Sequence, residues 1–139
     1  MKRVCSIAIA AIALMSCSSD STSPTSLSMG TYTLTSVDSR ALPATVTVNG
    51  FTETFTSGTL VVADTSYTFS VCVRSAFSET ACGAGFDMLS SAGPWFIRNG
   101  SLVFVDAVSD SAATVKVSGT RLTVPFATNK SLSFGFDMQ

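Results

Sequence analysis

Apolar and polar side chains alternate along most of the chain from Gly30 to its last residue. A period of two residues is typical of a strand that has one face in a core and the other in water. The longest such stripe has its apolar positions at Tyr67, Phe69, Val71 and Val73, with polar or small residues between them. Shorter runs of the same kind predict eight or nine strands in all.

Two Asn-Gly pairs punctuate these runs, Asn49-Gly50 and Asn99-Gly100. Both residues tolerate positive φ, so each pair predicts a two-residue hairpin turn. The second turn would place Trp95 opposite Phe104 and Ile97 opposite Leu102, with these four side chains on one core face.

A third turn is predicted at Ser118-Gly119, and a further break at Ser57-Gly58. The third turn would set Lys116 directly opposite Arg121, which is unfavourable for two like charges. We therefore expect an acidic side chain near this pair.

The stretch 75–93 shows no period and is predicted to be the longest loop of the domain. It contains Cys82, and Cys72 lies in the preceding strand, between Val71 and Val73. An even pair of cysteines in an oxidising compartment predicts a disulfide between them. The alternative is two buried free thiols.

Strands that follow one another through short turns favour a single up-and-down antiparallel β-barrel over residues 30–139. Closure into a barrel of about 8–9 strands removes the two exposed edges that an open sheet would leave. The alternative is a β-sandwich, whose Greek-key order needs long crossovers that only 75–93 could supply easily.

The N-terminal segment has a different pattern. Lys2-Arg3 precede an apolar run, Ile7 to Met15, whose nine residues are too few to span a bilayer. Leu14-Met15-Ser16-Cys17 resembles the lipobox of bacterial lipoprotein signal peptides, with Met at −2 as a departure. The resemblance implies that 1–16 is a removed signal peptide and that Cys17 carries acyl chains such as palmitate.

Residues 17–29 then form a Ser/Thr-rich tether behind the lipidated cysteine. The anchor makes a membrane of the cell envelope the first predicted partner. Ser18, rather than Asp, follows the cysteine, which implies the outer membrane of a Gram-negative host, on its periplasmic or surface face. In a host with one membrane the same signal implies the outer face of that membrane.

The first strand supplies a second resemblance. Gly30-Thr31-Tyr32-Thr33-Leu34 resembles the Gly-x-Trp opening of lipocalin-like barrels, with Tyr in place of Trp, and the first strand of META-domain lipoproteins. The later Cys-Asn segment of the META family is absent. The resemblance implies a barrel able to bind a small apolar ligand, and it transfers no site residue.

The charge of the chain and the motifs that it lacks argue against several classes of function. From Cys17 onward the chain has six Lys and Arg against nine Asp and Glu, a net charge of −3 without a basic patch, so we expect no nucleic-acid partner. The sequence has no His, no Gly-x-Ser-x-Gly and no phosphate-binding glycine loop. We therefore expect no enzyme activity, no metal site and no cofactor.

Two function classes remain. In the first, the barrel binds a small apolar ligand, and Glu53, between Phe51 and Phe55, orients it unless that carboxylate is solvated at the rim. The aromatic residues predicted to line the cavity are Tyr67, Phe69, Trp95, Phe104, Phe134 and Phe136. In the second class, the core is solid and the protein is a structural or interaction module that binds an envelope protein through 75–93. A cavity of about 300 Å³ or more with a few convergent polar groups would favour the first class.

Overall fold

A computed structural model describes residues 27–75, 88–126 and 132–139. Within these ranges the protein is all-β and contains ten strands. The strands are β1 (Gly30–Val37), β2 (Arg40–Ala41), β3 (Ala44–Val48), β4 (Phe51–Val62), β5 (Ser66–Ser75), β6 (Met88–Arg98), β7 (Ser101–Val105), β8 (Ala112–Ser118), β9 (Arg121–Phe126) and β10 (Leu132–Met138).

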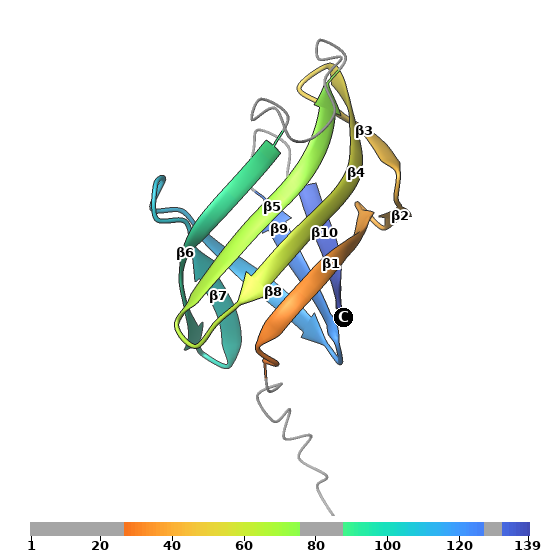
Figure 1. The fold of residues 1–139 in the computed structure, drawn as a ribbon. Coiled ribbons are helices and arrows are strands. Elements are labelled where there is room, and N and C mark those ends of the chain that lie inside the picture. Colours follow the sequence, from red (N-terminus) through yellow and green to blue (C-terminus); the bar gives the residue numbers. More distant parts are fainter. Residues whose placement is uncertain (1–26, 76–87, 127–131) are drawn as a thin grey trace, which may run out of the picture.

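Eight of these strands, β1 and β4 to β10, form a closed antiparallel barrel (Figure 1). From β4 to β10 each strand pairs with the next, and β1 closes the ring by pairing with both β10 and β4. The predicted up-and-down barrel is thereby confirmed, and the alternative sandwich is not formed.

The two additional strands lie between β1 and β4 in the sequence. The second half of β4 pairs with β1, whereas its first half pairs with β3, for example Val46 with Glu53. Ala44, Val46 and Val48 are buried, so β3 extends the core where β1 and β4 diverge.

Ser57-Gly58 is not a turn, contrary to our prediction. β4 continues through it with a register shift against β5 between Phe55 and Ser57. A Cβ at Gly58 would lie 2.9 Å from both the Ser70 carbonyl oxygen and Val71 Cγ2. The glycine therefore follows directly after a β-bulge, at a point where β5 approaches β4 too closely for a side chain.

Both Asn-Gly turns form as predicted, with positive φ at all four residues. The register of the second hairpin is also confirmed, since Trp95 faces Phe104 and Ile97 faces Leu102. The predicted core face is only partly correct. Leu102 and Phe104 of β7 are buried, but on β6 Trp95 is half-buried and Ile97 is 49% exposed, so only the β7 side of the hairpin joins the core fully.

The register predicted between β8 and β9 is wrong by one residue. The turn is Gly119-Thr120, so Lys116 faces Thr123, and Arg121 faces Ser118. The shift puts Val117 opposite Leu122, which keeps apolar side chains on one face, and it separates the two cations. The acidic neighbour expected here is present, because Asp137 pairs with Arg121.

Phenylalanines fill the centre of the barrel. The Phe69 ring contacts Phe134 and Phe136 edge-on, with centroids 5.3 and 5.5 Å apart, and stacks at 6.1 Å on Phe126. Phe55 meets Phe134 at 5.4 Å. All except Phe126 are almost fully buried, so this part of the interior is closely packed rather than hollow.

Candidate functional site

The strands around the barrel pair over staggered segments, which leaves an opening in one wall. β6 pairs with β5 over Met88–Pro94 and with β7 over Trp95–Arg98. β9 pairs with β8 only over Arg121–Thr123, and its remaining residues pair with β10. The β7–β8 turn, residues 106–111, is hydrogen-bonded to β6 from the Ala107 amide to the Ala92 carbonyl oxygen and projects at the left of Figure 1.

A pocket of about 710 Å³ occupies this opening, and we call it the seam pocket. Its apolar wall combines buried residues of β5, β7 and β9 with the half-buried end of β9. They are Tyr67, Phe69, Phe104, Val124 and Phe126. The rings of Tyr67 and Phe104 stack with centroids 4.2 Å apart and planes inclined by 10°, which gives the wall a rigid aromatic surface.

The first half of β6 forms the adjoining wall, where we predicted a loop. The strand begins at Met88, and its inward positions include the small residues Ser91 and Gly93. A Cβ at Gly93 would collide with the Val105 carbonyl oxygen, so a larger inward residue has no room there. The alternation of apolar residues that identifies strands is missing because this strand faces a polar site and a neighbouring backbone.

Asp106 is the centre of the polar side of the pocket. Its carboxylate accepts hydrogen bonds from Ser91 Oγ at 2.6 Å, the Ser109 amide at 2.7 Å, Ser109 Oγ at 2.9 Å and the Val108 amide at 3.0 Å. These bonds, led by the one from Ser91, lower the pKa of Asp106 from its ordinary value of 3.8 to about 2. Asp106 is therefore ionised throughout the physiological range.

Two further hydroxyl contacts extend this network. Tyr67 Oη lies 2.7 Å from Ser91 Oγ, and Ser109 Oγ lies 2.6 Å from Ser111 Oγ. Burial raises the pKa of the Tyr67 phenol, so it stays protonated at neutral pH. Asp106, the only Asp or Glu among the described residues that line the pocket, is thus linked to four hydroxyl groups from β5, β6 and the β7–β8 turn.

The structure brings together three of the seven side chains proposed from sequence as ligand contacts: Tyr67, Phe69 and Phe104. Phe134 and Phe136 lie in the packed centre of the barrel instead. Trp95 is half-buried and donates from Nε1 to the Ala63 carbonyl oxygen at 2.8 Å. Glu53 is half-buried on β4 and does not line the seam pocket.

Sequence reasoning missed the polar residues of the pocket. Asp106 is not among the contacts predicted from the sequence, and Ser91 lies inside the stretch 75–93 that is predicted to be a loop. The usable signal is Asp106 at the end of a strand with Ser109 three residues later, a spacing at which a carboxylate caps the amides of a turn. Nothing in the sequence indicates that Ser91 reaches the same carboxylate.

Two other predicted sites involve residues outside the described ranges. Cys17 lies there, so lipidation stays a prediction. Cys72 lies on β5 opposite Met88, whereas Cys82 is outside the described residues, so their pairing also stays a prediction.

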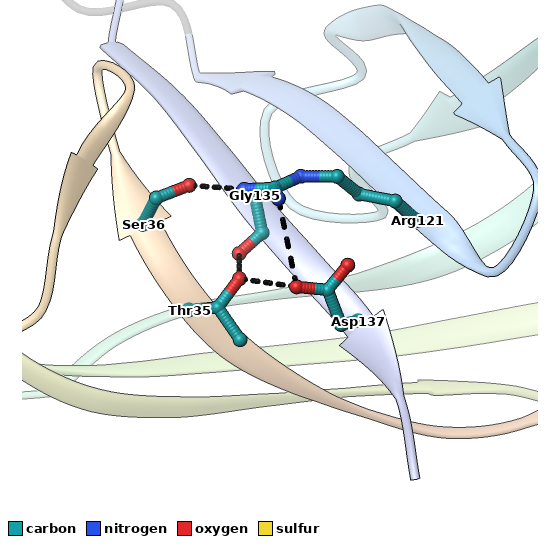
Figure 2. Close-up of polar contacts among 5 residues, drawn as sticks. All are labelled: Thr35, Ser36, Arg121, Gly135 and Asp137. Atoms are coloured by element: carbon teal, nitrogen blue, oxygen red, sulfur yellow. Dashed lines mark hydrogen bonds and ion pairs between the residues drawn. The ribbon is translucent and has the colours of Figure 1, made fainter.

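A second polar cluster, which we call the clamp, lies on the outer face of β1, β9 and β10 (Figure 2). Arg121 Nη2 donates to Ser36 Oγ at 2.6 Å, and Arg121 Nη1 lies 3.6 Å from the Asp137 carboxylate. Thr35 Oγ1 is 2.6 Å from the same carboxylate and 3.2 Å from the Gly135 carbonyl oxygen. Gly135 has no side chain to obstruct the guanidinium that crosses it.

A hydroxyl-lined hollow of about 330 Å³ adjoins the clamp. Arg121 and Asp137 are 44% and 37% exposed, and the guanidinium already has Ser36 and Asp137 as partners. A second carboxylate, Asp38, accepts from Ser133 beside the hollow, which weakens any attraction for an anion. The clamp therefore connects three strands, and the seam pocket is the stronger candidate for a ligand.

Searches of family models, curated proteins and solved structures find no match for this chain. Among the described residues, no three His, Cys, Asp or Glu side chains are grouped in a way that could hold a metal ion. The same residues include no helix with the length and apolar character that a membrane crossing needs. The resemblances to lipoproteins and lipocalin-like barrels stay predictions from the sequence.

Proposed function

We propose that this protein is a lipid-anchored lipoprotein of the cell envelope that binds a small, largely apolar molecule in the seam pocket. One observation carries the ligand proposal: a pocket of about 710 Å³ combines a stacked aromatic wall with the hydrogen-bonded carboxylate of Asp106. Small-molecule sites generally have this volume and this mixture of apolar walls with few polar groups. The envelope location rests on the lipobox-like residues that end at Cys17.

The alternative is a non-catalytic module that binds an envelope protein. The closely packed phenylalanines favour it, since their rings fill the part of the interior that they occupy, whereas many ligand-binding barrels hold a ligand inside. The two proposals differ in whether the seam pocket is ever occupied.

Native mass spectrometry of the full chain purified from its own host tests occupancy directly. A bound small molecule that dissociates on activation is the result expected for a ligand-binding protein. A mass that corresponds only to the processed lipoprotein would favour the interaction module.

A pocket-filling substitution tests the location. Ala113 lines the pocket from β8, and the adjacent Thr114 is exposed on the same strand and does not line it. Fluorescence titration with the neutral probe N-phenyl-1-naphthylamine should show binding to the wild type and to Thr114→Phe, and at least about tenfold weaker binding to Ala113→Phe, because the added ring takes up ligand space. Equal binding by all three proteins would place the probe elsewhere.

A further inference from the structure

The hydroxyl protons around the seam pocket have fixed directions. A serine hydroxyl has one proton, and an ionised carboxylate only accepts. Ser91 donates its proton to Asp106, so its oxygen must accept from the Tyr67 phenol at 2.7 Å. Ser109 also donates to Asp106, so the 2.6 Å contact with Ser111 must be a hydrogen bond donated by Ser111.

All four hydroxyl protons of the network therefore point along chains that end at Asp106. What this network offers to a ligand is oxygen lone pairs, above all that of Tyr67, and the negative charge behind them. Among the described residues that line the pocket there is no Lys or Arg, and Tyr67 and Asp106 are the only titratable side chains. No cation of the described pocket lining therefore neutralises the Asp106 charge.

The aromatic wall also favours ligands that carry hydrogen-bond donors or a positive charge. The Tyr67 and Phe104 rings in this wall stack on each other, and the faces of aromatic rings carry partial negative charge, which attracts cations and donor groups. A carboxylate head group would meet acceptors and a like charge instead, and its desolvation would have no compensating donor in this network.

From this arrangement we infer that the ligand is an organic cation, an apolar body that ends in a protonated amine, with the ammonium directed at the Tyr67–Ser91–Asp106 chain. This inference rests on the proposed ligand-binding function and specifies its ligand class. It separates this pocket from one that stores fatty acids, for which a carboxylate-binding donor would be needed.

Isothermal titration of the full-length protein at pH 7 with octylamine, 1-octanol and octanoate tests the inference, since the three probes share one chain and differ in the head group. Octylamine should bind at least about tenfold more tightly than octanoate, the effect of one charge-assisted hydrogen bond, with 1-octanol between them. Equal affinities, or tighter binding of octanoate, would overturn the inference while leaving the ligand-binding proposal intact. Absence of binding by all three would count against that proposal itself.

Two variants connect the preference to the network. Tyr67→Phe removes the lone pair that faces the ligand and leaves the turn bonds of Asp106 in place, so the preference for octylamine over octanoate should fall several-fold. Asp106→Asn removes the charge and should reduce the preference further, with circular dichroism as the check of folding. Asp64→Asn, an exposed change outside the pocket, should retain the wild-type preference. A preference that persists in folded Tyr67→Phe and Asp106→Asn would contradict the assigned direction of the network.

Discussion

Two charged residues organise the polar contacts of the barrel, and they differ in what surrounds them. Arg121 lies on the outer face between Ser36 and the Asp137 carboxylate, where opposite charges and solvent weaken its pull on a ligand. Asp106 has hydrogen-bond donors, and the part of the seam pocket lining that the structure describes contains no cation. A carboxylate stabilised by hydrogen bonds keeps its charge, so the field of Asp106 acts on whatever enters the pocket.

The same hydrogen bonds make the stability of the protein depend on pH. The pKa of Asp106 is about 2 in the folded protein and near its ordinary value of 3.8 when unfolded. Because the folded value is lower, its contribution to stability is fully present above about pH 5 and declines as the pH falls through this window toward 2. Wild type should therefore unfold at a higher temperature than Asp106→Asn at pH 7, and this difference should shrink toward pH 2.

Thermal unfolding followed by circular dichroism from pH 7 to pH 2 measures this difference. Asp64→Asn is the matched control, since Asp64 is exposed and does not line the pocket. Its melting temperature should follow that of the wild type across the range. If the melting temperatures of wild type and Asp106→Asn differed by the same amount at every pH, the Asp106 hydrogen bonds would not have the role given to them.

Strands were predictable from sequence wherever one face meets the apolar core and the other meets water. The stripe from Tyr67 to Val73 follows this rule and forms, whereas the hairpin at Asn99-Gly100 was predictable from its turn residues. The rule fails at the first half of β6, where Ser91 faces the pocket network and Gly93 faces a backbone carbonyl. The sequence pattern of β6 itself cannot reveal these two neighbours, Asp106 and the Val105 carbonyl, because both belong to β7 and the turn after it.

The close neighbours of two strand glycines predict different effects for the same substitution. A Cβ at Gly93 would collide with the Val105 backbone, which cannot move without separating β6 from β7. A Cβ at Gly135 would meet the side chains of Ser36 and Arg121, which can rotate away. We expect Gly93→Ala to lower the free energy of unfolding by about 3 kcal/mol or more and Gly135→Ala by about 1 kcal/mol.

Chemical denaturation monitored by fluorescence of Trp95, the single tryptophan, measures both changes. The comparison is internally controlled, since each variant adds one methyl group to a strand glycine. A Gly93→Ala variant as stable as Gly135→Ala would mean that β6 and β7 can separate at little cost.

At the scale of the whole molecule, strand order was predictable and the location of the pocket was not. Consecutive hairpins predict a meander, and exposed edges predict closure, so the barrel follows from the sequence. The cavity depends on the number of residues over which neighbouring strands pair. β8 and β9, for example, pair over only three residues each. A turn shifted by one residue, as at Gly119-Thr120, already changes that extent.

The sequence also predicts how the whole molecule is attached to the membrane. The lipid on Cys17 is the expected anchor, and residues 17–29 form the tether that connects it to the barrel. We propose to test this with Cys17→Ser placed behind a signal peptide that ordinary secretory cleavage removes, since loss of the lipobox cut would otherwise leave Ile7–Met15 attached. Stable anchoring by lipid needs more than one acyl chain, which only lipoprotein processing of Cys17 would supply. The variant should appear in the soluble fraction with the circular dichroism of the folded barrel, whereas Ser18→Ala behind the native signal should stay with the membrane. A folded Cys17→Ser variant that still sediments with membranes would require an attachment surface on the barrel itself.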